Sequence, residues 1–91
     1  MEVFYLDETT MKTIMSFLQA FYQRDCLESL KEKSAPPEQE ILERSILSID
    51  ISLLKIEEMV KGNLFFFLLF KSIREMSIEE KKFILEEHGI L

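Results

Sequence analysis

The sequence predicts an all-α protein, a small helical bundle of about four helices in which two long antiparallel helices are accompanied by two short ones. Large apolar residues recur at intervals of three and four along most of the chain, which is the spacing of one helix face. Only two glycines and two prolines occur in 91 residues, too few for the many tight turns of a small β domain. The composition is 47% hydrophobic and 31% charged, which is typical of a folded chain.

The first predicted helix begins after Asp7, whose side chain can cap it, with Glu8 in the first turn where the helix dipole favours an anion. An apolar stripe then continues for roughly six turns. Its members are Met11, Ile14, Met15, Leu18, Phe21, Tyr22, Cys26 and Leu30. The Pro36-Pro37 pair ends the helix, because proline disfavours helical geometry in the residue before it.

The second predicted helix runs from about Glu38 to Lys61, and Pro37 can occupy its first position. Six of its apolar residues keep a strict four-three spacing, the seam of an antiparallel or coiled packing: Leu42, Ile46, Ile49, Leu53, Ile56 and Val60. Others widen this surface: Ile41, Leu47, Ile51, Leu54 and Met59. A helix so widely apolar is covered on several sides, within the domain or at a subunit interface. Gly62 is expected to end it in the left-handed conformation.

The third predicted helix contains seven large apolar residues in a row, from Leu64 to Phe70. Periodicity cannot separate a buried strand from a buried helix here, but no partner strand is visible, so we expect a helix from about Leu64 to Glu75. Each large side chain left in water forfeits roughly 1.5–3 kcal/mol, so the run must be covered. Either the two long helices cover it completely, or part of it contacts another chain.

The last predicted helix, from Ile78 to Glu87, has signals at both ends. Ser77 and Glu80 have the spacing of a capping box at its start. Gly89 follows its end, and Ile90 can pack back on the helix in a Schellman ending. The four helices belong to a single domain over residues 1–91, with a proline-containing connection near residues 33–37.

Residues that usually carry chemistry are few and scattered. His88 and Cys26 have no ligand spacing, so we expect no metal and no cofactor. His88 is better explained as a cation at a helix C-terminus, and Cys26 as a small buried thiol. The glycines stand alone rather than in a phosphate-binding loop, and adjacent glutamates point apart on a helix. No catalytic residue is therefore predicted, and we expect the protein not to be an enzyme.

The net charge of −6 disfavours direct binding to nucleic acid or to an anionic membrane surface. The apolar run is far shorter than the ~20 residues needed to cross a bilayer. The segment from Met1 to Thr10 has neither a basic start nor a continuous apolar stretch, so we expect no signal peptide. A lone cysteine agrees with this, and we expect a cytoplasmic, intracellular chain.

Three features of the second half form a recognisable order. The segment from Ile49 to Gly62 (IDISLLKIEEMVKG) is followed by the apolar helix, and then by Met76 to Gly89 (MSIEEKKFILEEHG). This half resembles the helical domain of GINS subunits, the replication proteins that join the replicative helicase to other factors. Leu54-Lys55-Ile56 would stand for the family's Arg/Lys-Ile element, and Ser77 to Glu80 for its Thr/Ser-x-Glu-Glu helix start. The family's central helix is richer in Arg and Lys, and its members typically add a small β domain. The resemblance implies a scaffold subunit whose long helices pack against sister subunits.

Two functional hypotheses follow. The first is a non-enzymatic protein–protein interaction module, acting as an oligomer such as a homodimer or as a scaffold subunit, with the resemblance implying a role in DNA replication. Its interface would be anchored by Ile49, Leu53, Ile56, Val60, Phe65, Phe66 and Phe67. The second is a small acidic regulator or inhibitor that occupies a basic site on an enzyme or nucleic-acid-binding protein, through Glu38, Glu40, Glu43, Glu57 and Glu58. Apolar binding should survive high salt, whereas acidic binding should disappear.

Overall fold

The computed structural model describes residues 7–91, which form four helices and, within that range, no strand. α1 spans Glu8–Glu32, α2 Pro36–Val60, α3 Leu64–Glu75 and α4 Ile78–Glu87. The prediction of an all-α helical bundle is confirmed, and the two short helices have the predicted bounds. The expectation that the N-terminus carries no signal peptide concerns in part residues 1–6, which lie outside the described residues.

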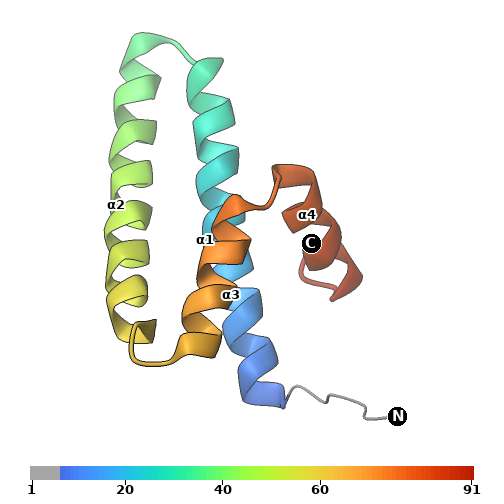
Figure 1. Ribbon diagram of the computed structural model, residues 1–91. Helices are drawn as coiled ribbons and strands as arrows, with labels where there is room; N and C mark the ends of the chain where they lie inside the picture. Colours follow the sequence, from blue (N-terminus) through green and yellow to red (C-terminus); the bar gives the residue numbers. More distant parts are fainter. Residues whose placement is uncertain (1–6) are drawn as a thin grey trace.

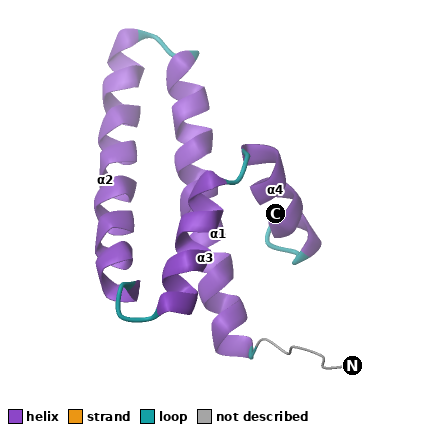
Figure 2. Cartoon of the chain, in the orientation of Figure 1, coloured by secondary structure: helices purple, strands orange, loops and turns teal. Residues whose placement is uncertain are grey.

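The long helices α1 and α2 lie side by side as an antiparallel hairpin (Figure 1). α1 contacts each of the other helices, and α3 also contacts α2. α4 lies beside α1, on the side away from α2 (Figures 1 and 2). The tip of the hairpin, at residues 33–35, extends beyond both short helices, so the molecule is elongated, with extents of 55 × 29 × 19 Å.

Side chains at the N-caps decide where three helices begin. Asp7, Asn63 and Ser77 each accept a hydrogen bond from the backbone N–H three residues further on, at 2.7, 3.2 and 3.1 Å. These bonds satisfy N–H groups that have no partner inside the helix. The caps predicted at Asp7 and Ser77 are confirmed. α2 instead begins with Pro36, one residue before the predicted Pro37, and proline suits a first turn where its missing N–H has no role.

The prediction that Gly62 adopts the left-handed conformation is wrong, since among the described residues Gly89 alone has a positive φ. α2 ends at Val60, and the N–H of Asn63 donates to the Val60 carbonyl at 2.9 Å. Lys61 keeps right-handed angles within this turn. Such a turn needs no left-handed residue, so the glycine is not required by the backbone there.

The end of α4 follows the predicted Schellman pattern. Gly89 has a φ of +71°, its N–H donates to the Glu86 carbonyl at 3.0 Å, and the N–H of Ile90 donates to the Leu85 carbonyl at 2.9 Å. These are the two hydrogen bonds that define the motif. Ile90 packs against the core, which turns the end of the chain back onto the bundle.

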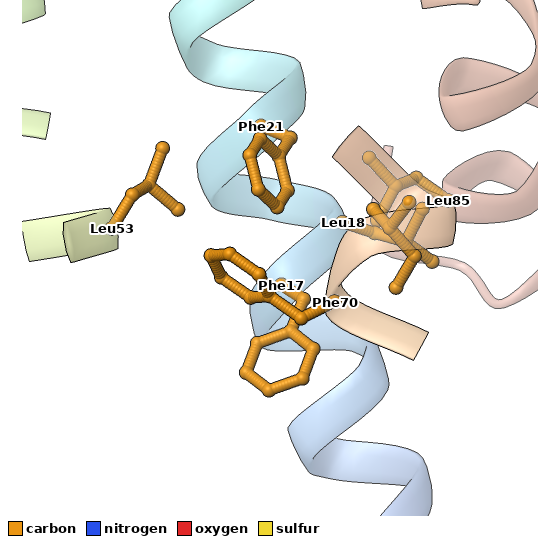
Figure 3. Close-up of a cluster of buried hydrophobic side chains, with 7 residues drawn as sticks. Phe17, Leu18, Phe21, Leu53, Phe70 and Leu85 are labelled. Atoms are coloured by element: carbon orange, nitrogen blue, oxygen red, sulfur yellow. The ribbon is translucent and has the colours of Figure 1, made fainter. Parts of the chain in front are cut away.

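One hydrophobic core joins all four helices. It contains Phe17, Leu18 and Phe21 from α1, Leu53 from α2, Phe70 and Ile73 from α3, and Leu85 from α4. Phe70 is fully buried, and its ring centroid lies 5.4 Å from that of Phe17 and 5.0 Å from that of Phe21. Figure 3 shows the three rings together, with Leu53 on one side and the leucines of α1 and α4 on the other. Because every helix supplies at least one residue, the four helices pack as a unit.

Candidate interaction surface

The seam predicted on the second helix faces the core of its own chain. Leu53 is 5% exposed and belongs to the core, and Ile49, Ile56 and Val60 are half-buried against it. These four residues are predicted to anchor an interface with another chain, and in the structure one of them is buried and three are half-buried. A four-three seam has the same spacing whether its partner helix belongs to the same chain or to another.

The apolar run on α3 is only partly covered by the chain. Phe70 is buried, Phe66, Phe67 and Leu69 are half-buried, and Leu64, Phe65 and Leu68 are exposed. Of the interface residues predicted here, Phe65 is therefore the most accessible, with 51% of its surface exposed. Side chains on a helix point in all directions around its axis, so neighbours on one side can cover only part of such a run.

The outward face of α2 carries a second apolar row, which we call the outer row. It consists of Leu47, Ile51 and Leu54, which are 59%, 46% and 61% exposed. Their spacing of four and three places them along one line of the helix. At 3.6 residues per turn, this line lies roughly opposite the seam that faces the core. The sequence shows these residues only as a widening of the seam, and the structure separates them from it.

Charged residues continue the outer row at both of its ends. Glu40 and Arg44 precede it and form an ion pair of 3.0 Å, while Glu58 and Lys61 follow it and form an ion pair of 2.6 Å. The hydrogen bond to Glu58 raises the pKa of Lys61 above its ordinary value. All four side chains are exposed, so they remain accessible to an approaching chain.

A cleft of about 550 Å³ lies where the four helices meet. Three cations and three acids line it: Arg24, Arg74, Lys81, Asp25, Asp50 and Glu57. Arg24 pairs with Asp50, and its Nη2 lies 3.3 Å from one carboxylate oxygen, which raises the pKa of the guanidinium. Arg74 pairs with Glu57 at 3.1 Å, and Lys81 pairs with Asp25. Among the described residues no buried polar side-chain atom lacks a partner, so these pairs join the helices to one another and do not point to a missing ligand.

Lys81 is the buried charged residue of this cleft, and the sequence analysis did not place it there. Its side chain is only 2% exposed, and its ammonium lies 5.7 Å from the centroid of the Phe21 ring. Ile78, Lys81 and Leu85 have the three-four spacing of one helix face. That spacing is a signal by which the lysine could have been placed at an inward position.

The prediction that Cys26 is a buried thiol is wrong, since the side chain is exposed. Leu18, Tyr22, Cys26 and Leu30 follow one another at intervals of four. Each four-residue step advances about 40° around a helix of 3.6 residues per turn. This part of the stripe therefore turns from the core toward solvent, and Leu30 is exposed as well.

His88 lies at the C-cap of α4, with Nδ1 2.9 Å from the carbonyl oxygen of Ile84. This is the helix-end position expected from the sequence. Among the described residues, no group of three or more His, Cys, Asp or Glu side chains could hold a metal ion. None of the four helices combines the length and the apolar character that a bilayer crossing requires.

Comparison with known proteins adds no relative: no protein-family model, no curated protein and no solved structure matches the chain. The resemblance of the second half to GINS subunits thus stays a prediction based on its short segments.

Proposed function

We propose that this protein is a non-enzymatic helical interaction module that packs against other protein chains, as an oligomer or as a subunit of a larger assembly. The observation that carries the proposal is the amount of apolar surface left outside the core. Eleven large apolar side chains of the described residues are at least 46% exposed, and eight of these lie on α2 and α3. Scattered apolar residues are normal on a protein surface, whereas their concentration on two consecutive helices is typical of an interface.

Covering these side chains would supply free energy for association. A fully buried large side chain contributes roughly 1.5–3 kcal/mol, so a half-exposed one contributes roughly 1 kcal/mol when another chain covers it. The part of that total which exceeds the entropy cost of association would appear as affinity. The apolar surface is thus a source of binding energy that needs no charged partner.

The alternative of an acidic regulator has less support. Four of the five acids that would carry it are already paired with cations of the same chain: Glu40 with Arg44, Glu43 with Lys31, Glu57 with Arg74 and Glu58 with Lys61. An acid with a cation beside it attracts a basic partner less strongly, because the two charges largely cancel at a distance. We therefore prefer apolar packing as the mode of binding.

A role as a scaffold subunit in DNA replication is the more specific form of this proposal. Its support is the resemblance of the Ile49 to Gly62 and Met76 to Gly89 segments to the GINS helical domain. Mixing the chain with purified GINS subunits and measuring the mass of any complex tests this form directly.

The test of the general proposal is capture of partner chains at low and high salt, with the mass of the native complex measured by light scattering. We expect a complex that persists at high salt. Two variants carry a pair of lysines in the apolar surface: Leu47→Lys with Leu54→Lys on α2, and Leu64→Lys with Leu68→Lys on α3. At least one of these variants should no longer form the complex. The matched control adds the same charges elsewhere on α2 (Ser48→Lys with Ser52→Lys) and should leave it intact.

A chain that stays monomeric and captures nothing at either salt concentration would contradict the proposal. A complex that disappears at high salt and that still forms with both lysine-pair variants would favour the acidic regulator instead.

A further inference from the structure

The outer row is the central part of a longer regular series on α2 and its C-cap residue, Lys61. Seven exposed residues follow one another at a strict four-three spacing: Glu40, Arg44, Leu47, Ile51, Leu54, Glu58 and Lys61. At 1.5 Å per residue the series extends over roughly 30 Å, and its spacing is that of a seam that packs against another helix. The seam on the opposite face of α2 has the same spacing and is filled by the chain itself. α2 therefore has two packing stripes, and one of them has no partner among the described residues.

The charges of this series are complementary to the same series read in the opposite direction. In order along α2 they are negative, positive, three apolar residues, negative and positive. In an antiparallel copy centred on Ile51, Arg44 comes level with Glu58 of the second copy, and Glu40 comes within one residue of Lys61. In a parallel copy every charged residue would instead meet its own like charge. Complementary charges of this kind select orientation more than they add affinity.

The outer row is accessible to an approaching helix, although Leu54 also borders the cleft between the helices. In Figure 1, α2 forms one edge of the molecule, and α1, α3 and α4 all lie to one side of it. The Glu40–Arg44 and Glu58–Lys61 pairs lie on the surface beside the apolar row. In an antiparallel dimer, the Glu40–Arg44 pair of one copy would lie beside the Glu58–Lys61 pair of the other copy at each end of the contact. The two acids and two bases at each end would then alternate in sign.

We propose that the outer row binds the outer row of a second copy of this chain, with the two α2 helices antiparallel about a two-fold axis near Ile51. The proposal rests on the proposed function and names one surface and one partner for it. Ile51 of the two copies would meet at the axis, with Leu47 of each copy beside Leu54 of the other. Helices in such contact lie about 8–10 Å apart, and the same patch serves both subunits, as in most dimers.

The first experiment measures the mass of the purified full chain by sedimentation equilibrium over a range of concentrations. We expect a dimer for the wild type and a monomer for Ile51→Lys, because that substitution places two like charges at the axis. Circular dichroism should show unchanged helix content, since Ile51 is outside the core. Ser52→Lys, the adjacent control on the same helix, should remain dimeric.

The second experiment tests the orientation by exchanging charges. Arg44→Glu alone and Glu58→Arg alone should each raise the dissociation constant of the dimer, by roughly tenfold at low salt, because each change creates two repulsive contacts. The double variant Arg44→Glu with Glu58→Arg should return it close to the wild-type value. In a parallel dimer each of these residues would face the same residue of the other copy. The double variant would then still place like charges together, so it would not restore the dissociation constant.

A wild type that is monomeric throughout overturns the proposal, as does a dimer that Ile51→Lys leaves intact or a double variant without restoration. None of these results would by itself contradict the proposed function. A partner that is retained at high salt and lost with the lysine pairs on α2 or α3 would keep the interaction module while excluding the antiparallel pair.

Discussion

The two apolar faces of α2 consist of the same residue types at the same spacing, yet one is buried and the other is not. Leu53 and Leu54 are neighbours in the chain, with 5% and 61% of their surfaces exposed. The inner face lies against the hydrophobic core, whereas the side chains of the outer row remain largely exposed. An apolar stripe thus indicates that a helix packs against something, but not whether that partner belongs to the same chain.

The same contrast applies to ion pairs. The pair of Lys81 and Asp25 lies at the junction of the helices, with the lysine almost fully buried. The pair of Arg44 and Glu40 lies on the surface of α2. The two pairs join the same kinds of group, but only the first keeps a charge out of water, so its loss should matter far more.

The largest expected effect on stability is the difference between truncating Leu53 and truncating Leu54. Leu53→Ala should lower the free energy of unfolding by about 3 kcal/mol, because it leaves a cavity beside the aromatic rings of the core. Leu54→Ala should change it by less than about 0.5 kcal/mol in the monomer, where the side chain is exposed. Chemical denaturation followed by circular dichroism, at concentrations too low for association, measures both. Equal losses would mean that the two faces of α2 are not distinct.

The second effect compares the ion pairs. Lys81→Ala should cost about 2 kcal/mol, because it leaves the Asp25 carboxylate without its cation; this is less than for a fully buried pair, since Asp25 is partly open to water. Arg44→Ala, the surface counterpart, should cost less than about 0.5 kcal/mol. The same denaturation measurement applies. A loss for Lys81→Ala no greater than that for Arg44→Ala would show that the buried pair contributes little.

A smaller effect on stability is expected from Asp7, the exposed N-cap residue of α1, and this effect depends on pH. The hydrogen bond from the backbone N–H of Thr10 lowers the pKa of Asp7 below its ordinary value of 3.8. The ionised cap therefore stabilises the fold above that value, and its contribution is lost as the pH falls through the lower pKa of the folded state. Asp7→Asn keeps a capping oxygen that does not titrate.

The measurement is thermal unfolding of the wild type and Asp7→Asn between about pH 6 and about pH 2. Any advantage of the wild type should shrink as the solution becomes acidic, while Asp7→Ala, which has no cap, should be the least stable of the three at neutral pH. If the difference in unfolding temperature between wild type and Asp7→Asn stays constant over this range, titration of Asp7 does not contribute to the pH dependence of stability.

The smallest effect concerns Cys26, on the outward side of α1. Cys26→Ala should change the free energy of unfolding by less than about 0.5 kcal/mol, because the side chain is exposed. Its thiol should react with a thiol-specific reagent in the folded protein at a rate close to that in denaturant. Strong protection in the folded state would instead agree with the buried thiol expected from the sequence.

The sequence by itself was sufficient for the four helices and for most of their ends. Asp7, Ser77 and Gly89 act through hydrogen bonds within a few residues, so their effect does not depend on the rest of the fold. The repeating apolar pattern likewise predicts that α2 is a helix with apolar residues on more than one side. Gly62 is the exception among the ends, because a turn of the kind found there does not depend on a left-handed residue.

Only the tertiary structure decided which side chains are covered. It placed the seam of α2 against the core, left the outer row exposed, turned Cys26 to solvent and brought Lys81 inside to meet Asp25. The physical reason is that helix formation depends on local hydrogen bonds and side-chain spacing, whereas burial depends on which segments, distant in sequence, lie against each face. For this chain, local spacing defines two stripes on α2, and the packing of α1 and α3 determines which stripe remains open to another molecule.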